Sequence, residues 1–166
     1  MKGLLLAAIL LTGCADDYSK KLATELADDL RNAGIEVSLR AKGEMLVVDL
    51  LSVSGERSPA DVTRVLFTAA ALVVKEHPEP YQEVVLEYRK GACFKLSGQD
   101  FYQLGKDFEA GENPVYLIRT LPEKLKTPTG KPAYEKWEGG WLGVSTRQME
   151  DFNDFHKKWW ITASTL

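Results

Sequence analysis

The side chains best suited to covalent chemistry in this sequence are a thiol and an imidazole in its second half. Cys93 could supply a nucleophile, His156 a base, and Asn153 or Asp154 a group that orients the base. Cys93, however, falls inside a predicted strand, and nothing in the sequence brings these residues together. The sequence favours a thiol that fills the core as a small apolar side chain, and pairing with another molecule is a further alternative. A hydrolase and a structural cysteine therefore both stay open.

The histidines and the charge balance argue against two other classes of site. His77 precedes a proline and His156 lies in the last predicted helix, and neither has a second histidine or a cysteine at metal-ligand spacing. We expect no metal and no cofactor. The 21 basic and 24 acidic side chains give a net charge of -3, which argues against a general nucleic-acid-binding protein, whose surface would be basic.

Three aromatic residues near the end of the chain predict a binding surface. Tyr134, Trp137 and Trp141 lie in a segment interrupted by Gly139 and Gly140. Aromatic rings on a loop offer flat faces that suit sugar rings, peptides or protein partners. The alternative is that the rings fold inward and cover the core beneath the loop.

The beginning of the chain carries a second distinctive cysteine. Lys2 is followed by an unbroken apolar run at positions 4–11, and then by Thr12, Gly13 and Cys14. As a helix this run spans about 12 Å, against about 30 Å for the hydrocarbon core of a bilayer, so it is too short to cross a membrane. A basic residue before a short apolar run is the layout of a secretory signal.

Residues 11–14, of sequence LTGC, resemble the lipobox of bacterial lipoprotein signal peptides. The resemblance implies that residues 1–13 are removed and that a lipid on Cys14 anchors the protein in a bacterial cell envelope. In this family's sorting rule, aspartate directly after the cysteine retains the protein at the inner membrane. Ala15 stands there, so in a host with two membranes we expect the outer membrane, facing the periplasm. An ordinary cleaved signal, or an apolar first helix, is the alternative.

The rest of the chain predicts a single α+β domain over residues 19–166, joined to Cys14 by a short tether at 14–18. Once Cys14 is lipidated, Cys93 is the only remaining thiol, so no intrachain disulfide can form. Apolar residues recur at helical or alternating spacing through the domain. In chain order these patterns predict a helix at 19–33, strands at 35–40 and 45–51, a helix at 59–76, strands at 84–88 and 92–96, and a helix opened by Ser97 and Asp100.

We therefore expect the order α-β-β-α-β-β-α, with helices packed on an antiparallel sheet of two hairpins. Asn113 and Pro114 then favour a short helix, although residues 115–121 fit a strand equally well. A long loop over residues 122–140 follows, and a C-terminal helix opened by Ser145 completes the domain.

The helix-strand-strand-helix-strand order of residues 19–89 is similar to that of BON-type domains of envelope lipoproteins, which are implicated in phospholipid contact. The Gly-Val pair which that family places before its last strand is absent here. Our leading hypothesis is a lipid-anchored envelope protein that binds or scaffolds a partner near the membrane without catalysis, with an envelope protein or a glycan as partner and the 122–141 loop as contact. A hydrolase and a BON-like phospholipid-binding module are the alternatives.

Overall fold

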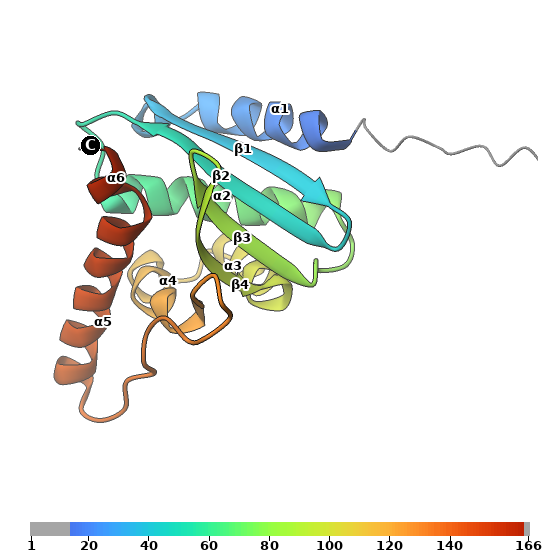
Figure 1. Ribbon diagram of the computed structural model, residues 1–166. Helices are drawn as coiled ribbons and strands as arrows, with labels where there is room; N and C mark the ends of the chain where they lie inside the picture. The colour runs from blue at the N-terminus through green and yellow to red at the C-terminus, as the bar shows by residue number, and fades with distance from the viewer. Residues whose placement is uncertain (1–13, 165–166) are drawn as a thin grey trace, which may run out of the picture.

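A computed structural model describes residues 14–164, with side chains from residue 18 onward, as a four-stranded sheet with helices behind it (Figure 1). Residues 1–13, the expected signal peptide, lie outside the described residues. The predicted order α-β-β-α-β-β-α, followed by a C-terminal helix, is confirmed. The elements are α1 (Cys14–Ala27), β1 (Ile35–Lys42), β2 (Met45–Val53), α2 (Pro59–Glu76), β3 (Glu83–Tyr88), β4 (Gly91–Ser97), α3 (Gly98–Glu109), α4 (Pro114–Thr120), α5 (Trp141–His156) and α6 (Thr162–Ser164), with 3-10 turns at Leu30–Asn32 and Pro122–Lys124 and a π turn at Lys157–Ile161.

The sheet is mixed, with strand order β1-β2-β3-β4. The two expected hairpins are present, since β1 pairs with β2 and β3 pairs with β4 in antiparallel fashion. The pair that joins them, β2 with β3, is parallel, and it places Leu46 beside Val84. The wholly antiparallel sheet expected from the sequence is thus corrected at its centre. The reason is that α2 connects β2 to β3 and returns the chain to the end of the sheet at which β2 begins. The two strands therefore run in the same direction.

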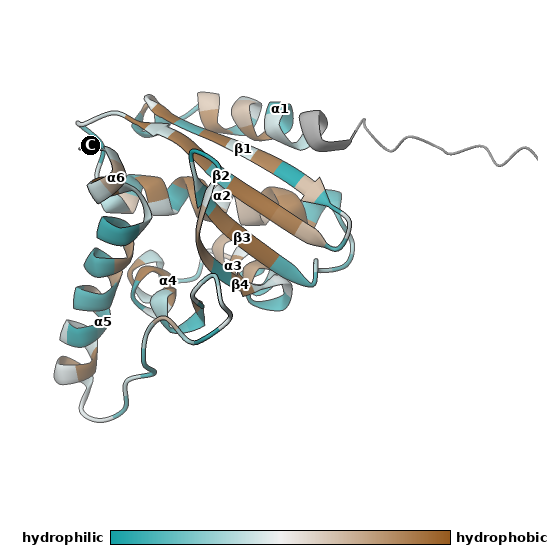
Figure 2. Cartoon of the chain, in the orientation of Figure 1, coloured by the Kyte–Doolittle hydropathy of each residue, from teal (hydrophilic) through white to brown (hydrophobic). Residues whose placement is uncertain are grey.

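Helix α2 is the central helix of the core. It begins as predicted: the Ser58 side chain accepts a hydrogen bond from the Asp61 backbone N–H, the Asp61 carboxylate accepts one from the Ser58 N–H, and Pro59 occupies the first turn. Hydrophobic residues are concentrated in α2 and in the strands β2 and β3 that lie over it (Figure 2). Helix α3 approaches α2 so closely that a Cβ on Gly105 would lie 2.5 Å from the carbonyl oxygen of Ala70.

Helix α1 covers residues 14–27 instead of the predicted 19–33. Residues 14–18, expected as an extended tether, form its first turns. The helix ends early because the Asp29 side chain accepts a hydrogen bond from the Arg31 N–H and so caps a separate 3-10 turn.

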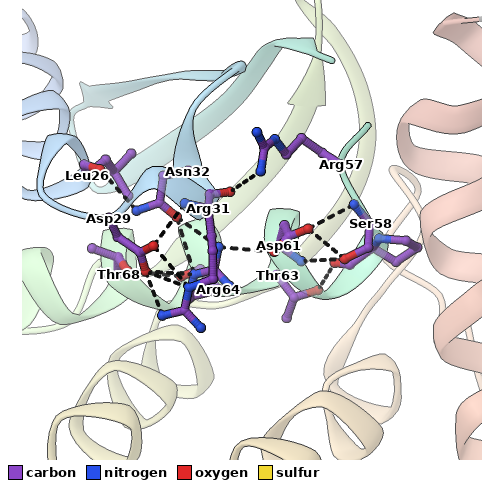
Figure 3. A network of polar contacts seen from close by, with 11 residues as sticks. Leu26, Asp29, Arg31, Asn32, Arg57, Ser58, Asp61, Thr63, Arg64 and Thr68 are labelled. Atoms are coloured by element: carbon purple, nitrogen blue, oxygen red, sulfur yellow. Dashed lines mark hydrogen bonds and ion pairs between the residues drawn. The ribbon is translucent and has the colours of Figure 1, made fainter. Parts of the chain in front are cut away.

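A polar network fastens this turn to α2 (Figure 3). The guanidinium of Arg64 lies 3.6 Å from the carboxylate of Asp29 and 3.1 Å from that of Asp61, and it donates to the amide oxygen of Asn32 at 3.2 Å. Asn32 itself donates to the carbonyl oxygen of Leu26, near the end of α1. One arginine on α2 thereby fixes the C-terminal end of α1 against the core.

Both edges of the sheet are covered. The Ser19 hydroxyl on α1 accepts a hydrogen bond from the N–H of Leu39 at 2.9 Å and donates one to its carbonyl oxygen at 3.1 Å, which satisfies outward-facing groups of β1. On the other side, the backbone of Lys95 in β4 exchanges two hydrogen bonds with that of Lys126. Covered edges leave little opportunity for a further strand to pair there.

The C-terminal part differs from prediction in detail. Residues 114–120 form a helix, so the strand alternative is excluded. Helix α5 begins at Trp141, ahead of the expected Ser145, and it widens into the π turn in which Trp159 and Trp160 are both buried. Among residues 14–164, none of the helices has the length and apolar character needed to cross a membrane.

Candidate functional site

His156 is fully buried, and both of its ring nitrogens have partners. The indole N–H of Trp160 donates to Nδ1 at 2.8 Å, so the neutral ring must carry its proton on Nε2. Nε2 then donates to the Thr63 hydroxyl at 2.8 Å, which donates to the carbonyl oxygen of Pro59. Burial lowers the pKa of His156 to about 3. The imidazole is a neutral structural group with no nitrogen left to act as a base.

Cys93 takes no part in that arrangement. Its thiol contacts the carbonyl oxygens of Gly91 at 3.3 Å and of Trp159 at 3.6 Å, and its side chain is partly buried. Burial raises the pKa of Cys93, and two nearby carboxylates act in the same direction, which favours the protonated thiol. The nucleophile, base and orienting group considered from the sequence are therefore not assembled into a catalytic unit.

Tyr134 and Trp137, two of the three aromatic residues expected to form a binding surface, are fastened to α5. The Tyr134 hydroxyl donates to Asp154 at 3.0 Å, and the Trp137 indole N–H donates to Asp151 at 2.6 Å. These carboxylates lie one turn apart on the same face of the helix. Tyr134 also stacks on Phe94 of the core, with ring centroids 6.2 Å apart. The two rings therefore act first as clamps that hold the long loop against the domain.

Burial and the hydrogen bond to Asp154 raise the pKa of the Tyr134 hydroxyl, so it stays protonated and remains a donor. On the other side of the contact, burial alone would raise the pKa of Asp154, but the ammonium of Lys158 and the Tyr134 hydroxyl together lower it. The clamp is consequently a neutral donor on an ionised carboxylate, which is a strong type of hydrogen bond.

Trp141 is the third aromatic residue, and it behaves differently. It is the first residue of α5, its side chain is 70% exposed, and the next residue, Leu142, is 75% exposed. The guanidinium of Arg119 on α4 lies over the Trp141 ring, 5.8 Å from its centroid. A hollow of about 460 Å³ separates the two helices at this point. Its lining includes Tyr116, Arg119, Trp137, Glu138, Trp141 and Val144.

We use the name α4–α5 surface for Tyr116, Arg119, Trp137, Trp141 and Leu142. Six large hydrophobic side chains are exposed among the described residues, and four of them lie here: Val115, Tyr116, Trp141 and Leu142. Tyr116 and Arg119 were not predicted as surface residues from the sequence. A signal was present: with the helix capped at 113, buried residues spaced four apart at 117 and 121 leave position 116 on the outer side.

A second polar cluster lies on the sheet face opposite the helices. Arg40 of β1 donates to Asp49 of β2 at 3.0 Å and to Glu87 of β3 at 2.5 Å. Asp49 is only 1% exposed, and it also accepts the backbone N–H of Lys90 at 3.1 Å, in the turn between β3 and β4. The cluster joins three strands and the second hairpin, so we assign it a structural role.

The other histidine is also engaged. His77 stacks on Tyr81 with centroids 4.5 Å apart, and its Nδ1 contacts the carbonyl oxygen of Glu79. Within the described part of the chain, no three histidine, cysteine, aspartate or glutamate side chains are grouped so that they could hold a metal ion.

Comparison with known protein families, with curated proteins and with solved structures gives no match for this chain.

Proposed function

We propose that this chain is a lipid-anchored protein of the bacterial cell envelope that binds a partner protein through its α4–α5 surface. The observation that carries the proposal is the exposure of Trp141 and Leu142 beside the hollow, in a domain whose other tryptophans are buried or hydrogen-bonded. Exposing large apolar side chains together is unfavourable in water unless a partner covers them. Tryptophan, tyrosine and arginine are also the residues that most often dominate the energy of protein interfaces.

The anchor is proposed from the leader, with its short apolar run and the segment LTGC that ends in Cys14. Helix α1 begins at that cysteine, so a lipid there would hold the domain close to the bilayer. In Figure 1, α5 lies on the opposite side of the molecule from the first turn of α1. The α4–α5 surface would then face away from the anchoring membrane, into the periplasm for an outer-membrane lipoprotein.

The phospholipid-binding alternative has less support than the protein-binding one, because the apolar hollow that could take a lipid lies far from the anchored end of the domain. A hollow of about 370 Å³, lined by Ala23, Leu26, Leu30, Ile35 and Val37 among others, lies beside the C-terminal end of α1. Helix α1 is about 20 Å long at 1.5 Å per residue, so this hollow is far from the end that carries Cys14. A hydrolase that uses Cys93 with His156 has less support, because both ring nitrogens of His156 already have hydrogen-bond partners.

The anchor and the binding surface are tested separately. Cys14→Ser should move the full-length protein from the membrane fraction to the soluble fraction, and unchanged fractionation would refute the anchor. A photo-crosslinking amino acid at position 141 should give a discrete adduct in intact cells. The matched control places the same amino acid at Leu30, which is 85% exposed and lines the separate hollow beside the end of α1. Equal adducts from both positions, or none from 141, would refute the binding surface.

A further inference from the structure

Each tryptophan of the α4–α5 surface carries a guanidinium over its ring. Arg119 lies over Trp141 at 5.8 Å from the ring centroid, and Arg147 lies over Trp137 at 4.5 Å. Neither arginine forms an ion pair with any residue in the described part of the chain. Cation–π contact holds a guanidinium in place but leaves its charge uncompensated.

Most of the carboxylates around this surface already accept a hydrogen bond from, or form an ion pair with, a residue other than these two arginines. Asp151 accepts the indole N–H of Trp137, and Glu123 accepts the amide N–H of Gln148 at 2.6 Å. Asp154 is paired with Lys158 at 2.6 Å. Glu138 is the exception, since it lines the hollow and is exposed. The guanidiniums of the two arginines therefore have no ion-pair partner among the described residues, although the carboxylates of Asp151, Glu123 and Glu138 lie in the same region.

We infer that the partner meets this surface with an acidic segment, in which carboxylates pair with Arg119 and Arg147 while a neighbouring apolar side chain covers Trp141. This inference rests on the proposed function and adds the chemistry of the partner. Arginine recognises carboxylates through paired N–H donors, and here both guanidiniums are already positioned by a ring. The Nη groups of Arg119 donate to no acceptor among the described residues, and its Nε is buried without an acceptor there, so the side chain has donors free for a partner.

A protein segment suits the surface better than a glycan. Sugar hydroxyls need several polar side chains around the ring on which the sugar stacks. Here the exposed neighbours of Trp141 include the aliphatic Leu142, and Val144 lines the hollow. The amide N–H of Gln148 is already bonded to Glu123. Aliphatic, aromatic and arginine side chains together are the usual composition of a protein interface.

The test selects short random peptides displayed on phage against the full chain, with the Trp141→Ala variant used to remove peptides that bind elsewhere. The recovered peptides should be enriched in aspartate and glutamate next to an apolar residue. Binding of a selected peptide should weaken as NaCl rises from about 0.05 to about 0.5 M, because exposed charge pairs are screened. Oligogalacturonate, an acidic glycan, is tested in parallel for binding that depends on Trp141.

Charge variants locate the interaction. Arg119→Gln and Arg147→Gln should each weaken the selected peptide by about 3- to 5-fold, the range for an exposed ion pair. Glu138→Gln should strengthen it by about 2-fold, because a like charge is removed. Lys42→Gln, which removes one positive charge from an exposed position on β1, should change the affinity by less than about 1.5-fold. Melting curves of all variants confirm that each one is folded.

The outcomes separate the two proposals. Peptides that need Trp141 but are neutral or basic would overturn the acidic partner and leave the proposed function standing. Equal losses from Lys42→Gln and Arg119→Gln would also overturn it, because the effect would follow net charge. Trp141-dependent binding of oligogalacturonate without any peptide would assign a glycan instead. Failure to recover any Trp141-dependent peptide would overturn the acidic partner, and equal crosslinking from positions 141 and 30 would overturn both proposals.

Discussion

The indole N–H of Trp160 donates a hydrogen bond to Nδ1 of His156, 2.8 Å away and one helical turn earlier. This contact fixes the tautomer of a fully buried imidazole and directs its remaining proton to Thr63 on α2. The C-terminal helical segment is thereby joined to the N-terminal end of the central helix. A protonated ring would place an N–H against the indole N–H, so the arrangement requires neutral histidine.

Acidification should destabilise the protein through His156. Its pKa is lowered from 6.5 to about 3 in the folded state, so the unfolded chain takes up the proton first as the pH falls. Stability is complete above the unfolded pKa and is lost progressively below about 6.5. We expect a decrease of about 2 kcal/mol in the free energy of unfolding between pH 7.5 and pH 5, measured by urea titration. His156→Leu provides the control, and the same pH dependence in that variant would rule out this origin.

The two tryptophans of the α4–α5 surface should differ in their effect on stability. Trp137→Phe removes the donor to Asp151, so we expect a loss of about 1 kcal/mol or more in the free energy of unfolding. Trp141→Ala removes a ring that is mostly in water, and its effect should stay within about 0.5 kcal/mol. Thermal and urea unfolding measure both. A large loss from Trp141→Ala would make that ring a packing residue and argue against its role in binding.

Two glycine-to-alanine substitutions should change the stability of the protein in opposite directions. At Gly105 the new Cβ would collide with the backbone of Ala70, so α3 must move away from α2 at a cost of about 2 kcal/mol or more. At Gly143 in α5 a Cβ meets no atom within 4 Å, so alanine should stabilise the helix by about 0.5 kcal/mol. The urea midpoints of the two variants should move in opposite directions, and destabilisation at Gly143 would contradict the described position of α5.

The buried carboxylate of Asp49, on the sheet face opposite the helices, should be important for stability. Asp49→Ala leaves the backbone N–H of Lys90 without its acceptor and removes one partner of Arg40, so we expect a loss of about 2–3 kcal/mol. Asp49→Asn keeps an acceptor oxygen and should lose less than the alanine variant. Hydrogen exchange of the Lys90 amide should accelerate in Asp49→Ala. An unchanged exchange rate would show that the turn does not depend on this carboxylate.

Local signals in the sequence were sufficient for most of the elements. The start of α2 is marked in the sequence by Ser58 and Asp61, which form its cap, and the alternation of apolar residues indicated both hairpins. Such features depend on neighbours within a few residues, so a single sequence contains them. The same holds for the leader that ends in Cys14, which remains a prediction. The sequence did not determine where α1 ends, because Asp29 competes as a cap for a separate turn.

The tertiary structure decided the relationships between distant segments. The parallel pairing of β2 with β3 follows from the path of α2 across the sheet, which no local pattern specifies. The role of His156 depends on Thr63, far away in the sequence, and its neutrality follows from burial. Tyr134, Trp137 and Trp141 looked alike in the sequence, but the carboxylates of α5 bind the first two and leave the third in solvent. Periodicity cannot separate such residues, because their environments are created by contacts that form only when the chain has folded.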